Sequence, residues 1–369
     1  MNIPVNITDL LPAEIEAQPV LIGEPKFRSK QIFSAIHARG ASSFEEMVLL
    51  PKVLRQKLTE RFTVKTLNEI KTTSSEKFNT NKYLFALERD PAIKIETVLI
   101  SEKGRNTVCV STQAGCNVGC EFCATGKLGF RKNLSAGEIC MQVYEVKRLA
   151  GVEITNIVYM GMGEPFLNYP NVFRSLIMFT DSDGMSLPGK RITVSTVGFK
   201  GKIKKFADDI TSPGSEKLRN IKLALSLHST DNGVREAIIP TSKINRLPDI
   251  YEELVYYYRK TGNKITYEYI HFPGINDTVN DVKRLSALST MVPSNINIIP
   301  FHPIGFKLNG PLEKLNDSFS DTKKLLSNQK LNDLITSLKE RGVVVNLRTS
   351  SGVDINAACG QLALAGENP

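Results

Sequence analysis

The sequence of 369 residues has no tryptophan, no internal repeat and no low-complexity segment. It also lacks an apolar run long enough to cross a bilayer, which excludes a membrane-spanning helix and predicts no membrane partner. Residues 1–15 do not combine a basic stretch with an apolar one, so we expect no export signal. These absences predict a globular protein of the reducing cytoplasm, and a composition of 41% hydrophobic and 23% charged residues fits that class.

Acidic residues are fewer than basic ones, 38 against 47, which gives a formal net charge of +9. Such an excess is typical of proteins that contact phosphate backbones. Basic residues gather at 127–133 and 189–205, although lysines on solvated helix faces would explain individual positions there. Nucleic acid is therefore the expected class of partner.

The chain is longer than one ordinary domain, and its two parts differ in pattern. Apolar residues recur at helical spacing near the start, so residues 1–90 are predicted to form a small helical domain. The runs at 81–90 and 93–102 predict a β-hairpin that leads into a second domain, residues 91–369.

The second domain alternates short apolar runs with segments that are long enough for helices. The runs are TVCVS, ITNIVYM, RITVST, IKLALSLH, KITYEYI, NINIIPF and VVVNLRT, in chain order from residue 107. This alternation is typical of an α/β fold with a parallel sheet, either doubly wound or closed as a complete or partial barrel. In each of these architectures the functional site lies at the carboxyl ends of the strands.

Six cysteines occur, and a cytoplasmic chain of this size favours catalysis or metal binding over disulfides. Cys116, Cys120 and Cys123 lie in the run GCNVGCEFCATG, shortly after the first apolar run. A structural zinc ion needs four ligands, and no histidine is near in the sequence. Three thiolates suit a 4Fe-4S cluster, whose fourth iron then stays open to a small chelating ligand. A zinc knuckle or a chance cluster is the alternative.

Glycines and polar residues follow several of the later apolar runs, at the edge where the cysteines are expected. Gly161 and Gly163 in YMGMGEP permit a close approach of the backbone to a ligand, although a simple turn also explains them. Ser195 lies near the end of the third run, His228 ends the fourth, and His302 directly follows the sixth.

The spacing Cys-x-x-x-Cys-x-x-Cys, with Phe122 before its last cysteine, resembles the signature of the radical S-adenosylmethionine (SAM) superfamily. The resemblance implies that Cys116, Cys120 and Cys123 bind a 4Fe-4S cluster and that the open iron binds the methionyl group of SAM. One electron, from a donor such as flavodoxin or ferredoxin, would then cleave SAM to a 5'-deoxyadenosyl radical. The fold implied is a partial (β/α) barrel with a small helical N-terminal domain.

Longer stretches resemble one narrow family, the radical-SAM adenine-C2 methyltransferases of large-subunit ribosomal RNA. They include TVCVSTQAGCNVGCEFCATGKLGFRKNL, NIVYMGMGEPFLNYPNV, FPGINDTVND and GVDINAACGQL, together with GEPKFRSKQIFSAIHARG in the helical domain. The resemblance implies methylation of 23S ribosomal RNA, and in some bacteria of transfer RNA, by a monomer whose helical domain binds RNA.

Adenine C2 is electron-poor and has no lone pair, so ordinary methyl transfer from SAM is excluded and covalent catalysis is needed. Cys359 matches the methyl-carrying cysteine of the family, and a second SAM would supply the radical that activates its S-methyl group. Cys109 matches the cysteine that releases the product by forming a disulfide with Cys359. Glu96 matches the base that removes the C2 proton, although a glutamate in such a run is often solvent-facing. A buried apolar thiol is the plainer interpretation of either cysteine.

The resemblance also implies a set of SAM contacts, namely Gly163, Glu164, Ser195, Ser226, Leu227 and His228. The chain departs from the family at His302, where asparagine is usual, but both side chains can hydrogen-bond a carboxylate or a ribose. Cys140, His37 and His271 are expected to be structural.

Three other functions stay open. Related antibiotic-resistance enzymes methylate adenine C8 with the same five cysteines, so the cysteines do not separate the two products. A zinc-dependent RNA-binding module without catalysis is the second, and a radical-SAM enzyme for a peptide or small molecule is the third. Iron and sulfide analysis tests the zinc module, because the enzyme should hold about four of each.

Overall fold

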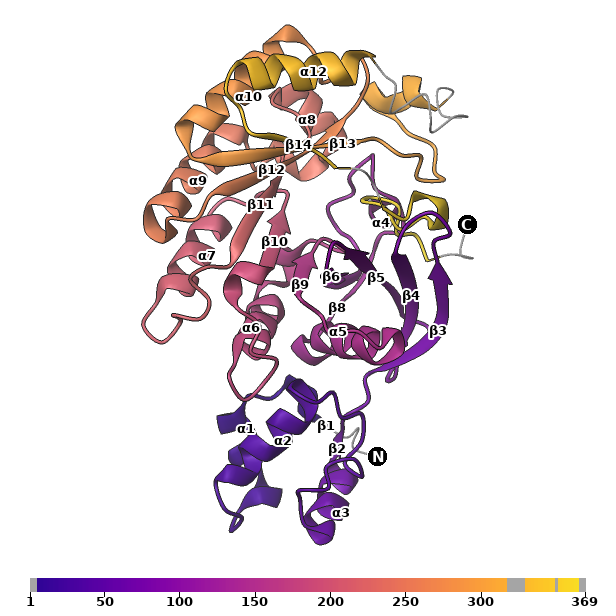
Figure 1. The fold of residues 1–369 in the computed structure, drawn as a ribbon, viewed down its shortest axis with the longest axis vertical. Helices are drawn as coiled ribbons and strands as arrows, with labels where there is room; N and C mark the ends of the chain where they lie inside the picture. Colours follow the sequence, from indigo (N-terminus) through magenta and orange to yellow (C-terminus); the bar gives the residue numbers. More distant parts are fainter. Residues whose placement is uncertain (1–4, 317–328, 349–350, 365–369) are drawn as a thin grey trace.

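The structure is a computed structural model that describes residues 5–316, 329–348 and 351–364 (Figure 1). It is built on a ten-stranded sheet in the order β14-β13-β12-β11-β10-β9-β6-β5-β4-β3. The strands are β3 (Leu67–Ser74), β4 (Thr80–Leu87), β5 (Lys94–Glu102), β6 (Arg105–Cys109), β9 (Asn156–Tyr159), β10 (Ile192–Thr196), β11 (Lys222–Ser226), β12 (Ile265–His271), β13 (Ser294–Pro300) and β14 (Val345–Leu347).

Neighbouring strands from β6 to β14 are parallel. The helices between them are α5 (Ala136–Ala150), α6 (Tyr169–Thr180), α7 (Lys202–Thr211), α8 (Asn232–Ile238), α9 (Leu247–Thr261), α10 (Val279–Met291) and α12 (Gln329–Glu340). Because the strand order never reverses, right-handed crossovers place these helices on one face of the sheet, as in a barrel. Among the described residues the edge strands β14 and β3 do not pair, so the barrel is partial. The predicted fold class is confirmed.

The sheet continues beyond β6 with antiparallel strands. β4 and β5 form the predicted hairpin, and β3 adds an edge strand to it. The sheet therefore begins at residue 67, whereas the sequence predicted strands only from residue 81 and ended the helical domain at residue 90. The sequence does not reveal β3, because most of its side chains are exposed and its few apolar residues do not alternate.

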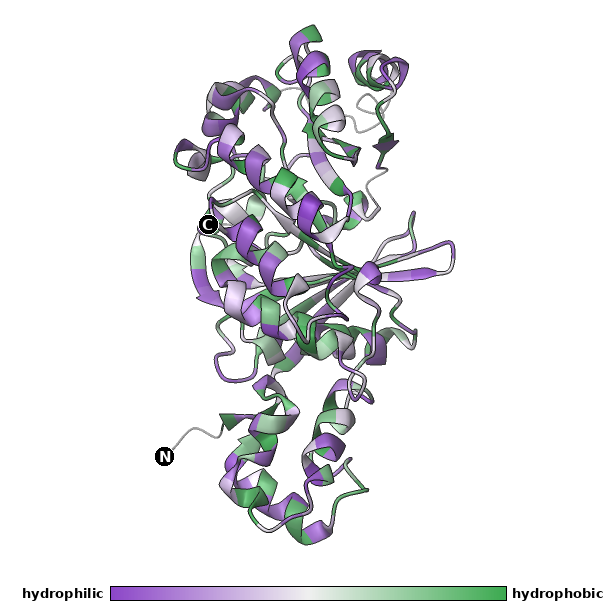
Figure 2. Cartoon of the chain, turned by 90° about the vertical axis from the view of Figure 1, so that its left-hand side faces the viewer, coloured by the Kyte–Doolittle hydropathy of each residue, from purple (hydrophilic) through white to green (hydrophobic). Residues whose placement is uncertain are grey.

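The N-terminal helices form the narrow end of the molecule in both views, as Figure 2 also shows. They are α1 (Pro12–Glu16), α2 (Phe27–His37) and α3 (Lys52–Arg61). Two short strands, β1 (Val5–Asn6) before α1 and β2 (Phe62–Thr63) after α3, pair in parallel and bring the ends of this part together. We call this part, residues 5–63, the helical lobe. In the described part of the chain no helix is both long and apolar enough to cross a membrane.

The helical lobe is fixed to the start of α5. Ser135 caps α5 through a capping box with Glu138. Gly137, the second residue of α5, donates its N–H to Asp9 Oδ1 of the lobe at 2.7 Å. A side chain at Gly137 would place its Cβ 2.0 Å from Thr8 Oγ1, so this contact between lobe and helix requires glycine.

Two residues expected to be structural are fully buried beside that contact. Cys140 lies in the core of α5, with its Sγ 3.8 Å from Met178 Sδ. His37 ends α2 on the side of the lobe that contacts α5, and its Nδ1 is 3.0 Å from the hydroxyl of Tyr144 in that helix. Burial lowers the pKa of His37 to about 3, so its ring is neutral in the folded protein at pH 7.

This buried histidine predicts a loss of stability in acid. In the unfolded chain His37 titrates near its ordinary pKa of roughly 6.5, whereas the folded pKa is depressed. The contribution to stability is therefore complete above roughly pH 6.5 and is lost as the pH falls toward the folded value. Between pH 7 and pH 5 we expect the free energy of unfolding to drop by about 2 kcal/mol on account of this group.

Urea unfolding followed by far-UV circular dichroism at both pH values measures the effect. His37→Gln has no group that titrates there, so the variant should lose about 2 kcal/mol less than the parent over this range. An equal loss in both proteins would contradict the neutral buried state of His37.

Candidate active site

A cavity lies at the carboxyl ends of β9, β10, β11 and β12. Its volume is about 130 Å³. Its lining includes Cys116, Cys120, Cys123, Gly163, Glu164, Ser195, Ser226, His228, Glu268 and Cys359. This first cavity brings together most of the residues that the sequence assigned to the cluster and to SAM.

The three clustered cysteines lie on one loop between β7 (Gln113–Gly115) and α4 (Ala124–Lys127). The N–H of Cys116 donates to Gly129 O at 3.0 Å, and that of Cys123 donates to Cys120 O at 3.2 Å. A Cβ at Gly115 would meet Gly129 O at 1.7 Å, so glycine is required where the loop begins. The backbone thus fixes a tight loop with its thiols toward the first cavity.

The donor set fits a 4Fe-4S cluster. Burial raises the pKa of Cys116 to about 12 and also raises the pKa of Cys120 and Cys123. Thiols in such surroundings are neutral by themselves, and a cationic centre such as iron is what would hold them as thiolates. Among the described residues no group of three His, Cys, Asp or Glu side chains could hold a single metal ion. A cluster instead takes one thiolate for each of three irons.

Glu164 ties the turn after β9 to the end of β10. Its two carboxylate oxygens accept the N–H groups of Phe166 at 2.9 Å and Val197 at 3.0 Å. Burial raises the pKa of Glu164 to about 7. The preceding Gly163 has φ +94°, and a Cβ there would lie 2.5 Å from Gln113 Cβ, so glycine allows this turn to pack on β7.

Ser195, at the end of β10, and Ser226 and Leu227, at the end of β11, were predicted to contact SAM. The hydroxyls of Ser195 and Ser226 are 3.2 Å apart and belong to the lining of the first cavity. Leu227 is fully buried, and its N–H donates to Glu268 O at 3.0 Å. Leu227 does not belong to the lining of the first cavity, so the prediction that it contacts SAM stays a prediction.

His228 follows β11 in a left-handed conformation with φ 54°. Its Nδ1 accepts the N–H of Ile270 at 3.1 Å, which assigns the proton of the neutral ring to Nε2. Burial, with a smaller effect from the cationic Arg235, lowers the pKa of His228 to about 3. The ring meets Phe122 edge-on at 4.7 Å between centroids. His228 is therefore a neutral hydrogen-bond donor in the wall of the first cavity.

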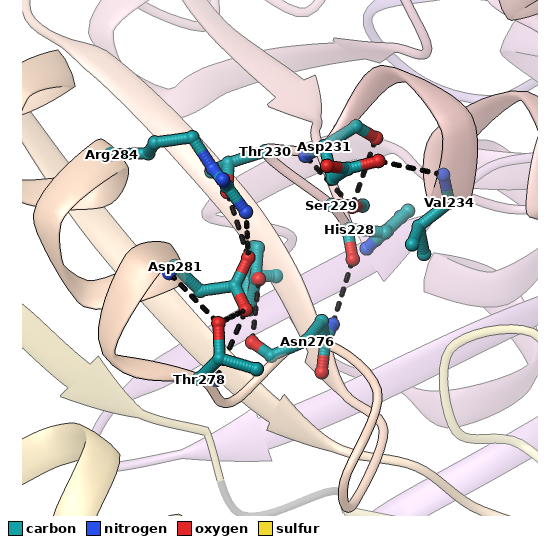
Figure 3. Close-up of polar contacts among 10 residues, drawn as sticks. His228, Ser229, Thr230, Asp231, Val234, Asn276, Thr278, Asp281 and Arg284 are labelled. Atoms are coloured by element: carbon teal, nitrogen blue, oxygen red, sulfur yellow. Dashed lines mark hydrogen bonds and ion pairs between the residues drawn. The ribbon is translucent and has the colours of Figure 1, made fainter.

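A hydrogen-bond network holds the loop that carries His228 (Figure 3). Asn276 is fully buried and donates from Nδ2 to His228 O at 2.8 Å. Thr230 donates to Asp281 Oδ1 at 2.9 Å, and Arg284 donates to both of these side chains. These contacts from α10 and the segment before it stabilise the left-handed backbone at His228.

A second cavity, of about 330 Å³, adjoins the first. Strands β5, β6 and β9 line it on one side, β13 and β14 on the other, and residues 351–364 close it. Cys109 and Arg348 belong to its lining, and Cys359 lines both cavities. All six cysteines are free thiols, so the expected disulfide between Cys109 and Cys359 is not a feature of this structure.

The two cysteines of the second cavity differ in their surroundings. Burial raises the pKa of Cys109 to about 12, and the nearby Cys359 adds to the shift. Desolvation also raises the pKa of Cys359, but the guanidinium of Arg348 opposes that shift. Arg348 itself lies 3.8 Å from the carboxylate of Glu268. Arg348 opposes the shift at Cys109 as well, but at Cys359, which is the exposed one of the two, it is the largest opposing cause.

Glu96 is fully buried behind the second cavity and does not belong to the lining of either cavity. Its carboxylate lies 3.0 Å from Lys82 Nζ and accepts the N–H of Ala363 at 2.9 Å. Glu102, on the same face of β5, is the acidic residue that does line the second cavity. Glu96 as the base therefore stays a prediction.

Glu268 and Arg348 are cavity residues that the sequence analysis did not predict, and His302 is a predicted SAM contact that lines neither cavity. Glu268 and Arg348 line the cavities but lie in strand-like runs without a motif, and only a charge inside an apolar run hints at them. Glu268 Oε2 is buried and has no hydrogen-bond partner among the described residues. His302 is buried, neither of its ring nitrogens has a hydrogen-bond partner there, and it lines neither cavity.

Known families match the chain over both of its parts. Residues 110–285 match the family model of the radical SAM superfamily. Residues 5–64 match the model described as the ribosomal RNA large subunit methyltransferase N-terminal domain. The second match covers the helical lobe and ends before β3.

Whole-chain relatives carry one common name. A protein of Salinibacter ruber named probable dual-specificity RNA methyltransferase RlmN is 42% identical over 358 residues, which cover 94% of this chain and 90% of that protein. A protein of the same name from Flavobacterium psychrophilum is 38% identical over 348 residues, with 93% of each covered. The crystal structure of a radical SAM methyltransferase from Sphaerobacter thermophilus has a TM-score of 0.85 at 34% identity, covering 98% of this chain and 100% of that one.

The cysteine loop gives a direct prediction. Replacing Cys116, Cys120 and Cys123 together by alanine should abolish the iron-sulfur absorbance and bound sulfide after anaerobic reconstitution, since no iron retains a thiolate ligand there. Cys140→Ala, in the core of α5, is the matched control and should keep full iron content. Full iron content in the triple variant would reject this loop as the cluster site.

Proposed function

Because this chain belongs to the RlmN family of radical SAM RNA methyltransferases, we propose that it methylates carbon 2 of an adenosine in 23S ribosomal RNA, and of transfer RNA as well. The relatives' name, dual-specificity RNA methyltransferase, supports the second substrate. The observation that carries the proposal is that Cys359 lines both cavities, one with the cluster thiols and one with Cys109. The reaction takes place in the cytoplasm, with a small electron-transfer protein as reductant.

The first cavity is the SAM site of the proposal. Cys116, Cys120 and Cys123 would hold a 4Fe-4S cluster, which when bound would supply the electron that cleaves SAM. Glu164 offers its carboxylate to the methionyl amine, and the neutral Nε2–H of His228 donates to an acceptor on SAM. Gly163, Ser195 and Ser226 line the same cavity and complete the proposed SAM contacts. Leu227 and His302 do not line it, so their contact with SAM rests on the family resemblance alone.

Cys359 carries the methyl group between the two cavities. Adenine C2 has no electron pair with which to displace a methyl group from a sulfonium, so a protein nucleophile must take it first. The thiolate of Cys359 forms the new S–CH₃ bond, the sulfonium C–S bond breaks, and S-adenosylhomocysteine leaves with the electron pair. Arg348 favours the thiolate form, because its positive charge opposes the raised pKa of this thiol.

Cys109 releases the product. Addition of the carbon radical derived from the S-methyl group to C2, followed by loss of the C2 proton, leaves one electron in excess, which a bound cluster would take back. Base and protein are then joined through the sulfur of Cys359. The Cys109 thiolate attacks that sulfur and forms a disulfide, while the sulfur–carbon bond breaks and its electron pair, with a proton, completes the methyl group. Glu96 is the candidate base for the C2 proton, supported by its place on the same face of β5 as Val98 and Ile100 of the second cavity.

Loss of Cys109 should stop the reaction at the covalent stage. In Cys109→Ala, methyl transfer to Cys359 and bond formation to adenine should still occur, so the protein should accumulate bound to RNA. Denaturing gels with labelled RNA, followed by peptide mass spectrometry, would show a methylene bridge between Cys359 and the base. A cavity from this substitution alone would cost a few kcal/mol of stability at most and would leave turnover intact.

Two comparisons sharpen this experiment. Cys359→Ala should form no adduct, and Cys140→Ala should turn over normally. Nucleoside digests of the parent reaction against the C2 and C8 isomers identify the product, and 8-methyladenosine would replace the proposed specificity by that of the antibiotic-resistance relatives. Release of methylated RNA by Cys109→Ala at a near-normal rate would remove the two-cysteine mechanism.

The helical lobe is the proposed RNA-binding part. Lys52, Lys57 and Arg61 are exposed on α3 and offer positive charge to phosphates. Their joint replacement by glutamine should weaken RNA binding and reduce the slope of log K against log salt by up to about 2 to 3, since each phosphate contact adds slightly less than one unit. Filter binding over a series of salt concentrations measures both quantities.

A matched variant removes the same charge elsewhere. Lys264, Lys283 and Lys339 are exposed on or beside the outer helices of the barrel, so their joint change to glutamine should alter the salt slope little. Equal effects of the two triple variants would show that net charge, and not the lobe, sets the RNA affinity.

A further inference from the structure

The loop that carries Cys359 is tied near both ends to one buried ion pair. Lys82 Nζ donates to Asn356 O at 3.2 Å, before the cysteine. Glu96 Oε2 accepts the N–H of Ala363 at 2.9 Å and that of Leu364 at 3.3 Å, after it. The pair itself is closed by 3.0 Å between Lys82 Nζ and Glu96 Oε1. We call residues 356–364 the thiol loop.

The strand register explains why the pair forms. In the β4–β5 hairpin, Lys82 lies opposite Val98 and Glu96 lies opposite Leu84. Lys82 and Glu96 are therefore diagonal neighbours on one face of the sheet, within reach of each other's long side chains. Lys82 is 5% exposed and Glu96 is 0% exposed, so both charges are almost fully removed from water.

Burial of such a pair needs a reason other than stability. Two buried charges gain little over well-packed apolar residues, because desolvation offsets most of their attraction, but they can fix one arrangement of the chain. Here the hydrogen bonds of Lys82 and of the Glu96 carboxylate go to the backbone of the thiol loop. On the side of the loop that faces α4, the donors are uncharged: Ala124 N donates to Gly360 O at 2.7 Å, and Thr125 Oγ1 donates to Leu362 O at 2.8 Å.

These contacts define where the sulfur can be. The middle of the thiol loop is attached to α4, directly after the cluster cysteine Cys123, and its ends are attached to β4 and β5. Cys359 is thereby held where the two cavities meet, with Cys109 of β6 in the same wall. Gln361 Nε2 also donates to Pro303 O at 2.9 Å, from the middle of the loop. Without the ion pair the loop would keep these middle attachments and the turn bond from Ala357 N to Gly352 O, but it would lose its bonds to β4 and β5.

We propose that Lys82 and Glu96 are positioning residues that hold the Cys359 thiol against Cys109. This inference rests on the proposed function, in which these two sulfurs react with each other. It gives the Glu96 carboxylate a task that precedes any removal of the C2 proton, and it assigns a role to Lys82, which carries no motif in the sequence.

The test measures how readily the two thiols find each other, without SAM, RNA or turnover. Full-length protein with its cluster reconstituted is equilibrated anaerobically in glutathione buffers, where glutathione disulfide is reduced as the Cys109–Cys359 disulfide forms. Alkylation and peptide mass spectrometry give the fraction of this one disulfide, and hence the effective concentration of the two thiols. Lys82→Met should lower that effective concentration by about tenfold or more, because the loop end is released.

Three variants keep the result interpretable. Lys82→Arg retains the charge and should restore most of the effect. Lys82→Met combined with Glu96→Gln removes both buried charges, so it should fold where the single variant is destabilised and should still show the lowered effective concentration. Lys132→Met is the control, because it breaks an ion pair away from the thiol loop, between Lys132 of β8 (Phe130–Asn133) and Glu138 of α5. It should leave the fraction of disulfide unchanged.

The outcomes separate this inference from the proposed function. If the parent protein forms the disulfide and the double variant forms it equally well while folded by circular dichroism, the positioning role of the pair is wrong. If the parent itself forms no Cys109–Cys359 disulfide at any glutathione ratio, the two-cysteine mechanism fails. A normal effective concentration in Lys82→Met would likewise overturn the positioning role.

Discussion

The return of the C-terminal segment to the first strands of the sheet is the contact on which the proposed chemistry depends. Cys359 lies near the chain end, yet Thr125 beside the cysteine loop donates to Leu362, and the buried Glu96 of β5 holds Ala363. Strands from the two ends of the sheet face one cavity, and the returning segment closes it. A partial barrel allows this arrangement, because its first and last strands do not pair with each other in the described part of the chain. One thiol can therefore serve two cavities.

Burial explains why these sulfurs need partners. The pKa of Cys109 and of Cys116 is raised to about 12, so neither thiol ionises by itself near neutral pH. Iron supplies the missing positive charge for the cluster cysteines in the proposal, and Arg348 supplies part of it for Cys359. The same burial keeps His228 neutral and raises the pKa of Glu164 to about 7, so the wall of the first cavity holds hydrogen-bonding groups of low charge.

Sequence reasoning succeeds here where spacing has a direct chemical meaning. The three cysteines predicted to share a ligand lie on one loop and line one cavity, and Gly163 makes the close backbone approach that was predicted for it. Cluster binding itself stays a prediction. The apolar runs predict the parallel strands, because strands covered by helices are buried on both faces. Glu268 and Lys82 are different. Their roles come from contacts between segments far apart in the chain, and no local pattern reports such contacts. Lys82 in particular resembles any lysine in a strand until the thiol loop is seen to bind it.

The central claim is that the methyl group reaches adenine by way of the Cys359 sulfur. The most direct test is a reaction with SAM whose methyl group is fully deuterated, followed by mass spectrometry of the methylated nucleoside. Passage through an S-methyl group that gives up one hydrogen, and regains one from solvent on release by Cys109, predicts a product methyl with two deuterium atoms. A product that retains all three would mean that the methyl group was transferred intact, and it would contradict the account.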